Sequence, residues 1–203
     1  MTHSAKGTRL NRKGIQTRQA LLASAVRRLA AGGPEAASAN RIARDAGVTW
    51  GTVQHQFGDV DGLWAAVLHH ICDTAGPIVA VPGNASSVHQ RVAGIVEQLW
   101  RALDSPGALA IQNLRQALPR QRERLEADYP LTAAAILAWD TGWTEAYEKA
   151  FQGLEVDRDR LRRVRALLPG AMRGLHSEAG LSTYIDLEEA KQGLVEALTA
   201  YLS

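Results

Sequence analysis

The chain has 203 residues, of which 46% are hydrophobic and 22% are charged, and these proportions are ordinary for a soluble globular protein. They exclude a disordered chain and a collagen, and the single cysteine excludes an intrachain disulfide. No apolar run approaches the roughly 18 residues of a membrane-spanning helix, and no apolar segment follows the basic N-terminus as in a secretory signal. We therefore expect one or two domains, a cytoplasmic location and no membrane partner.

The net charge of +2 conceals an asymmetry between the two ends of the chain. Residues 1–58 carry nine lysine and arginine side chains against two acids, a balance of +7, whereas the remainder carries −5. A basic block beside an acidic body indicates that one end of the protein meets a polyanion. Charge alone leaves open the alternative of a basic solubilising tail without a partner.

Alanine and leucine are frequent and runs of β-branched residues are scarce, so we expect an all-helical chain without strands. Capping residues and glycine stops divide the first part of the chain into four helices. The expected N-caps are Thr17, Ser38, Thr49 and Asp59, and the expected ends are Gly32, Gly47, Phe57 and Ile71.

The second part of the chain shows longer helical patterns after a loop rich in Pro, Gly, Asn and Ser over residues 76–87. The expected helices span residues 88–103, 108–118, 130–153, 161–176 and 187–202, which gives about nine in all. Pro169 and Gly170 should kink or split the fourth of these. Asp186 is the expected N-cap of the last, with Glu189 three residues later.

Residues 38–57 have the spacing of a helix-turn-helix: a short helix, a glycine turn and a second short helix. Ala43 is small enough for the two helices to cross closely, and Gly47 suits the tight turn. Apolar side chains at Val48, Val53 and Phe57 would anchor the second helix. Its outward face would then present side chains to a DNA major groove, as a recognition helix does. An ordinary helical hairpin is the alternative reading of the spacing.

From Thr17 to Ile71 the chain resembles the N-terminal domain of the tetracycline-repressor (TetR) family of bacterial transcription regulators. The segment IARDAGVTWGTVQHQFGDVDGL carries most of the likeness. The matching positions are Ile42, Ala43, Ala46, Gly47, Val48, Thr49, Gly51, Thr52, Val53, Phe57 and Leu63. Departures from the family pattern occur at Trp50, Gln54, Gln56 and Val60, where Lys, Tyr, His and Lys are frequent. These departures concern the DNA-facing side and therefore the operator, not the fold.

The resemblance implies a helix-turn-helix DNA-binding domain over residues 15–75 and a helical ligand-binding and dimerisation domain over residues 76–203. Gln54 is expected to pair with an adenine, and Trp50 to contact a thymine methyl or a sugar. The alternatives are a solvated or phosphate-bound Gln54 and a Trp50 packed on the domain surface. The expected DNA-contacting set is Ser38, Asn40, Arg41, Thr49, Trp50, Gly51, Thr52, Gln54, His55 and Gln56, most of them as phosphate contacts. The basic arm before residue 14 is either a further DNA contact, disordered when free, or a solubilising tail.

A single short recognition helix contacts too few base pairs for useful specificity. Two copies on a palindromic operator double that number, so we expect a homodimer. The resemblance places the interface on the last two helices. The expected interface residues are Leu187, Ala190, Leu194, Ala197, Leu198 and Tyr201, although this stripe could instead close the monomer's own core. The expected pocket for a hydrophobic or aromatic small-molecule effector is formed by Trp100, Gln112, Asn113, Trp139, Trp143, Tyr147 and Met172, which could equally be core residues.

The sequence contains no nucleophile elbow, phosphate loop or dinucleotide fingerprint, so we expect no catalytic residue, no cofactor and no metal. His69 and Asp73, four residues apart on one helix, make a metal site conceivable, but a polar helix end is the preferred interpretation. The predicted function is a sequence-specific transcription regulator, a repressor released from its operator by a small ligand. The alternatives are a DNA-binding regulator without a small-molecule inducer and, more remotely, an all-α enzyme.

Overall fold

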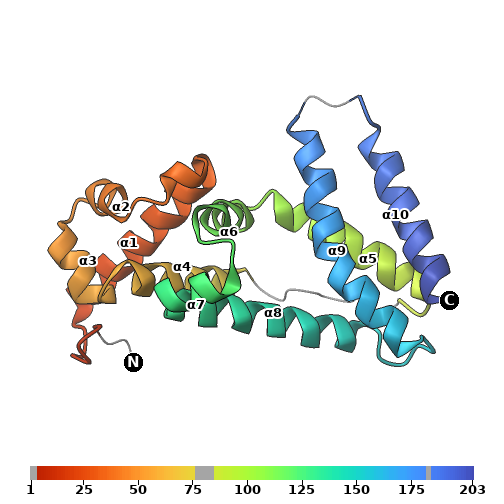
Figure 1. The fold of residues 1–203 in the computed structure, drawn as a ribbon, viewed down its shortest axis with the longest axis horizontal. Coiled ribbons are helices and arrows are strands. Elements are labelled where there is room, and N and C mark those ends of the chain that lie inside the picture. Colours follow the sequence, from red (N-terminus) through yellow and green to blue (C-terminus); the bar gives the residue numbers. More distant parts are fainter. Residues whose placement is uncertain (1–3, 76–84, 182–183) are drawn as a thin grey trace. The chain divides into compact units, whose positions relative to one another are not determined.

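The computed structural model describes residues 4–75, 85–181 and 184–203. In these ranges the chain forms ten α-helices and one 3₁₀ turn, and no β-strand. The all-helical class is therefore confirmed, with one helix more than expected. The helices divide into two compact units, each described by itself below (Figure 1). None of the helices in the described ranges is long and apolar enough to cross a membrane.

The first unit combines the N-terminal helices with residues Ser105–Trp139. Its elements are α1 (Arg12–Ala31), η1 (Pro34–Ala36), α2 (Ala39–Asp45), α3 (Trp50–Phe57), α4 (Val60–Thr74), α6 (Pro106–Ala117), α7 (Arg122–Asp128) and the start of α8 (Pro130–Ala150). Helix α6 packs along α1, and Leu29 and Leu114 meet in the same buried cluster as Ile42, Val53 and Leu63. The predicted boundary at residue 76 separates a DNA-binding from a ligand-binding domain, and this division by function stays a prediction. The first packing unit differs from it, because that unit also includes residues 105–139.

Helix α1 begins six residues earlier than predicted, because Asn11 and not Thr17 is its N-cap. The Asn11 side chain accepts a hydrogen bond from the Gly14 amide at 2.8 Å. The Thr17 hydroxyl lies inside the helix and donates to the Lys13 carbonyl at 3.0 Å. The first turn was missed because its residues are mostly polar and carry no apolar stripe.

Helix α7 was not predicted, and it buries none of its side chains. Two exposed ion pairs lie along its surface, Arg122 with Glu126 at 3.3 Å and Arg124 with Asp128 at 3.2 Å, and the half-buried Leu125 packs against the hydrophobic cluster of the first unit. Pairs four residues apart stabilise a helix by only a few tenths of a kcal/mol each, about 0.3–0.5 kcal/mol. A helix of this kind leaves no hydrophobic periodicity in the sequence.

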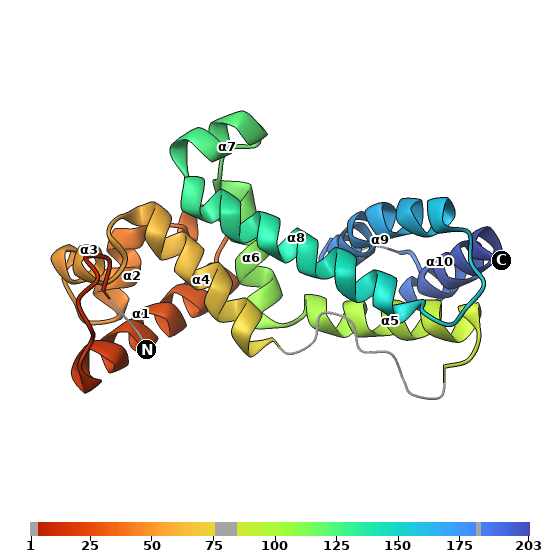
Figure 2. The ribbon, with the colours of Figure 1, turned by 90° about the horizontal axis from the view of Figure 1, so that it is seen from below.

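The second unit consists of α5 (Val88–Leu103), the end of α8, α9 (Arg158–Ala179) and α10 (Leu187–Leu202). Helix α10 packs against both α5 and α9, and α9 and α10 lie side by side (Figure 2). The core of this unit includes Ile95, Tyr147, Leu168, Met172 and Leu202, all almost fully buried. The predicted helices 88–103 and 187–202 are confirmed, whereas most of the predicted loop at 76–87 lies outside the described residues.

Pro169 does not split α9, which runs as one helix from Arg158 to Ala179. A proline inside a helix cannot donate to the carbonyl four residues earlier, here that of Arg165. The indole Nε1 of Trp143 donates to this carbonyl at 3.3 Å and replaces the lost backbone donor. The expected split is wrong, because a side chain from α8 donates to the carbonyl that the proline leaves unpaired. A kink at this point stays a prediction.

Candidate nucleic-acid interface

The helix-turn-helix predicted at residues 38–57 is formed by α2, a tight turn and α3. Gly47 adopts a φ of +69°, the left-handed conformation that the turn requires. The next amide, that of Val48, donates to the Ala43 carbonyl at 2.9 Å and closes the turn. Thr49 caps α3 by accepting from the Thr52 amide at 3.4 Å. Val53 and Phe57 are buried beneath α3, so its other face is turned outward.

The outward surface of the two helices carries most of the predicted DNA-contacting residues. Six of them are exposed: Asn40, Arg41, Thr49, Gly51, Gln54 and His55. Ser38 and Thr52 are half-buried, and the Ser38 side chain makes no capping hydrogen bond to α2. Trp50 is also half-buried and packs against the hydrophobic cluster of the first unit, which favours the packing alternative for this side chain. The roles of these residues toward DNA stay predictions.

Gln56 differs from the other predicted DNA contacts because its side chain points into the protein. It is only 4% exposed, and its Nε2 donates to the Gly14 carbonyl of α1 at 3.1 Å. A buried amide joined to another helix cannot at the same time hold a phosphate. The predicted phosphate contact is therefore corrected: the residue ties α3 to the first turn of α1.

Arg18 is a second support of α3 that the sequence did not reveal. Its Nη1 donates to the Gln56 carbonyl at 2.9 Å, and its guanidinium lies 4.3 Å from the centre of the Phe57 ring. Partial burial lowers the pKa of Arg18 by desolvation. A cation over an aromatic ring contributes about 0.5–2 kcal/mol. The contact joins residues 38 positions apart, so no local pattern could have indicated it.

The N-terminal arm from residue 4 also touches the end of α3. The Ala5 amide donates to the His55 carbonyl at 3.3 Å, and Ser4 and Leu10 are buried. This differs from the expectation of an arm that is disordered when free. The arm's Lys6 and Arg9 remain exposed beside the recognition helix.

The basic charge of the N-terminal segment is largely available to a partner. Seven of its nine cationic side chains are exposed: Lys6, Arg9, Arg12, Lys13, Arg27, Arg41 and Arg44. The other two have internal partners, Arg18 as above and Arg28, which binds Asp45 at 2.5 Å. The Arg28 hydrogen bond lowers the pKa of Asp45, and the neighbouring Arg44 is exposed. Such a surface attracts a phosphate backbone.

Helix α4, which packs against α3, is joined to the start of α8 by a buried carboxylate. Asp61 is 6% exposed and accepts hydrogen bonds from the amides of Leu131 at 2.9 Å and Thr132 at 2.8 Å. The Thr132 hydroxyl donates back to the Asp61 carbonyl at 3.2 Å. Asp61 therefore caps the N-terminus of a helix to which it does not belong, with a charge that suits the helix dipole.

The residues predicted for an effector pocket do not gather in one unit. Gln112, Asn113 and Trp139 belong to the first unit, and Trp100, Trp143, Tyr147 and Met172 to the second. Asn113 donates to the Leu29 and Gly32 carbonyls at the end of α1. The Trp143 indole donates to the Arg165 carbonyl, and Tyr147 and Met172 are core residues. In the described residues, no group of three metal-ligating side chains gathers around His69 and Asp73 or elsewhere.

The residues predicted for a dimer interface lie along one face of α10. Ala197 and Tyr201 are exposed, and Leu187, Ala190 and Leu194 are half-buried. Leu198 is buried and faces the core with Lys191, Val195 and Leu202. Five of the six residues are thus accessible on the monomer, and the sixth belongs to its core.

Two comparisons with known proteins gave matches, one to part of the first unit and one to nearly the whole chain. Residues 21–67 match the family described as bacterial regulatory proteins, tetR family, and this stretch runs from α1 into α4. Among solved structures, the crystal structure of the multidrug binding protein EbrR complexed with imidazole matches with a TM-score of 0.59. The sequence identity is 19%, and the match covers 97% of this chain and 96% of that chain. No curated protein matches the chain.

Proposed function

We propose that this member of the TetR family of bacterial regulatory proteins is a repressor that leaves a palindromic operator when a small hydrophobic or aromatic ligand binds. The chain is a DNA-binding regulator of that family. The observation that carries the proposal is the exposed face of α3, with Gln54 and His55, in a unit whose α1, α2 and N-terminal arm carry seven exposed basic side chains. Phosphate contacts would fix the position on DNA, and Gln54 would read a base edge.

The small size of the recognition helix α3 favours a dimer. One helix of eight residues contacts few base pairs, and two copies related by a two-fold axis double the site. The exposed stripe on α10 supports an interface there, because Ala197 and Tyr201 have no core role in the monomer. In such a dimer the recognition helices would meet half-sites about 34–36 Å apart on the DNA.

Ligand control is supported by the likeness to a protein described as multidrug binding, although that description belongs to EbrR alone. A ligand that binds one shape of the dimer more tightly shifts the population toward it and changes the affinity for DNA. A regulator without a small-molecule inducer is the second candidate, because the residues predicted for the pocket have structural partners in this fold.

The test of DNA binding is selection of genomic fragments by the purified full chain, followed by sequencing at two salt concentrations. A recovered palindrome supports the proposal, and unselective DNA that is lost at the higher salt contradicts it. An Arg41→Gln variant should bind all DNA more weakly and with a smaller salt dependence. Arg101→Gln is the charge-matched control, since Arg101 pairs with Glu97 in the second unit.

The test of ligand control follows from the genes beside the recovered palindrome, which indicate a pathway. Small molecules from that pathway are titrated into the complex of the full chain with the labelled palindrome, and release is followed by fluorescence polarisation. Release by a hydrophobic or aromatic compound supports the repressor mechanism. Retention of the DNA with every compound favours the regulator without an inducer.

A further inference from the structure

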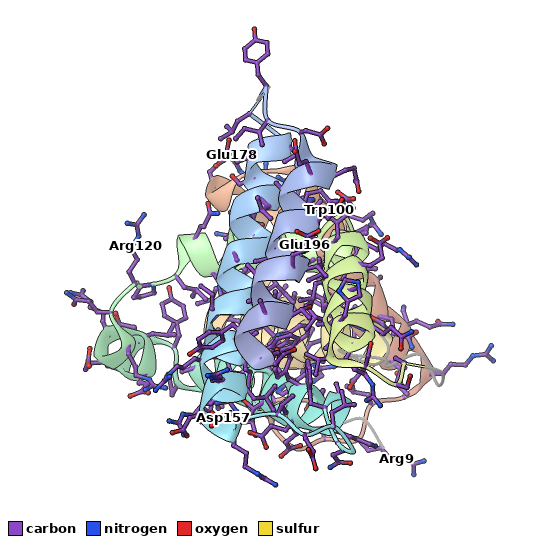
Figure 3. All side chains as sticks on the ribbon, turned by 90° about the vertical axis from the view of Figure 1, so that its right-hand side faces the viewer. Arg9, Trp100, Arg120, Asp157, Glu178 and Glu196 are labelled. Atoms are coloured by element: carbon purple, nitrogen blue, oxygen red, sulfur yellow. The ribbon has the colours of Figure 1, made fainter. Side chains whose placement is uncertain are left out.

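A cavity of about 420 Å³ lies in the second unit where α8 ends and α9 begins. Its walls come from the last turn of α8, the loop over residues 151–156 and the first two turns of α9. Figure 3 labels Asp157, the N-cap of α9, at this end of the helix, with Glu178 toward the other end. A volume of this size accommodates a small organic molecule.

One side of the cavity is apolar and fixed. Tyr147, Phe151 and Leu161 are almost fully buried in the core of the unit, and Leu154 and Val156 are half-buried beside them. The Tyr147 and Phe151 rings pack with their centres 5.1 Å apart. Because these side chains already belong to the packed core, this wall is preformed and binding needs little ordering.

The other side of the cavity is cationic. Three arginines of α9 line it: Arg158, Arg162 and Arg165. Arg165 binds Glu148, which also lines the cavity, at 2.9 Å, and Arg162 binds Asp159 at 3.0 Å. Arg158 has no ion pair among the residues that the structure describes. The side chains lining the cavity therefore carry an excess of two positive charges.

Tyr147 is the most deeply buried residue of the cavity wall. Its side chain is fully buried and its hydroxyl has no hydrogen-bond partner in the described structure. A buried hydroxyl without a partner costs about 1–3 kcal/mol. Because this oxygen is closed off from solvent, the case for a ligand rests on the apolar wall and the arginines of the cavity.

We propose that this cavity binds an organic anion with an apolar body, a carboxylate-bearing aryl or alkyl compound. The carboxylate accepts hydrogen bonds from Arg158 and Arg162, and the body lies on Phe151 and Leu161. Arginine suits this headgroup because its planar fork matches a carboxylate with two parallel hydrogen bonds. The assignment deepens the proposed function and rests on it in one respect: the anion is the effector that changes DNA affinity.

The experiment is isothermal titration calorimetry of the full chain with three probes that separate headgroup from body. They are 4-phenylbutyrate, the neutral 4-phenylbutan-1-ol and acetate. We expect 4-phenylbutyrate to bind at least about tenfold more tightly than either of the others, the size of one hydrogen bond to a charged group. Equal binding of the alcohol, or no binding of 4-phenylbutyrate at millimolar concentration, overturns the site.

Variants locate the binding. Arg158→Gln and Arg162→Gln should each weaken 4-phenylbutyrate binding about tenfold, whereas Arg101→Gln, on the same unit but outside the cavity, should not. Tyr147→Phe should leave the unliganded protein as stable or more stable, because its hydroxyl has no partner to lose. Loss of binding in Arg101→Gln as well would refute the location.

The effector role has its own readout, which separates it from the site. The DNA affinity of the full chain is measured with the recovered palindrome in the presence and absence of 4-phenylbutyrate. A change in affinity that Arg158→Gln abolishes supports both the site and the regulation. Tight binding of the anion with unchanged DNA affinity overturns its role as effector and leaves the DNA-binding function standing.

Discussion

Replacing Gly62 by alanine is expected to destabilise the first unit, although alanine is the better helix former. Gly62 lies in the first turn of α4, directly after the corner that joins it to α3. A Cβ at this position would lie 2.0 Å from the Phe57 carbonyl oxygen and 3.1 Å from its carbonyl carbon. Real Cβ atoms do not approach other atoms within 3.0 Å, so about 1 Å of movement is required.

The balance of the two effects gives the expected magnitude. Alanine gains about 1 kcal/mol over glycine in a helix. The clash is with backbone and not with a flexible side chain, so α3 and α4 must move apart, and overpacking of this kind costs about 1–3 kcal/mol. The carbonyl belongs to Phe57, whose ring is buried under Arg18, so the movement also disturbs the supports of α3. The difference is a net loss of up to about 2 kcal/mol in the free energy of unfolding.

The matched control is Gly51→Ala in α3. A Cβ there would meet only the Thr49 hydroxyl oxygen, at an ordinary 3.7 Å, so stability should rise by up to about 1 kcal/mol. The assay is urea unfolding of the three proteins, followed by circular dichroism. If Gly62→Ala proved as stable as Gly51→Ala, the close approach of α4 to the end of α3 would be refuted.

Three further outcomes are expected. Gln54→Ala should reduce the preference for operator over random DNA about 5- to 150-fold, and equal weakening on both DNAs in a binding titration would contradict base reading. Ala197→Glu should give monomers in sedimentation velocity, because Ala197 is exposed on the proposed interface; an unchanged dimer would show that the interface lies elsewhere. Burial raises the pKa of Tyr147 above its ordinary value of 10.0, so the folded state keeps a proton that the unfolded state loses. Stability should therefore fall as the pH rises above about 10, and Tyr147→Phe should reduce this fall in pH-dependent urea unfolding; an identical fall in both proteins would contradict the burial of the hydroxyl.

Elements with an apolar stripe and local caps were predictable from the sequence. Thr49, Asp59 and Asp186 cap the helices that the sequence assigns to them, and Gly47 has the conformation that its turn demands. These features depend on residues a few positions apart. The start of α1 was missed because polar residues form it, and α7 was missed because only its Leu125 packs against the hydrophobic cluster, which makes no apolar stripe.

The sequence predicted which residues of the candidate site are exposed. It did not predict the long-range contacts that hold α3 in place. Exposed Gln54 and His55 follow from the helical spacing of Val53 and Phe57. The inward turn of Gln56 does not, because it depends on a carbonyl at Gly14, 42 residues away. Likewise, the Arg165 carbonyl that Pro169 leaves without a backbone donor accepts from Trp143, 22 residues earlier and on another helix. Long-range partners of this kind are decided by packing, which a single sequence does not display.

The first unit is discontinuous, and this has a consequence for the synthesis of the protein. When the ribosome has made residues 1–76, α1 still lacks α6, which covers Leu29, and Asp61 still lacks the helix that it caps. A buried carboxylate without its amide donors and an uncovered apolar helix face are both unfavourable in water. The recognition helix should therefore reach its final stability only after residue 139 has emerged. A fragment limited to residues 1–76 should accordingly be recovered as a loosely packed, protease-sensitive chain.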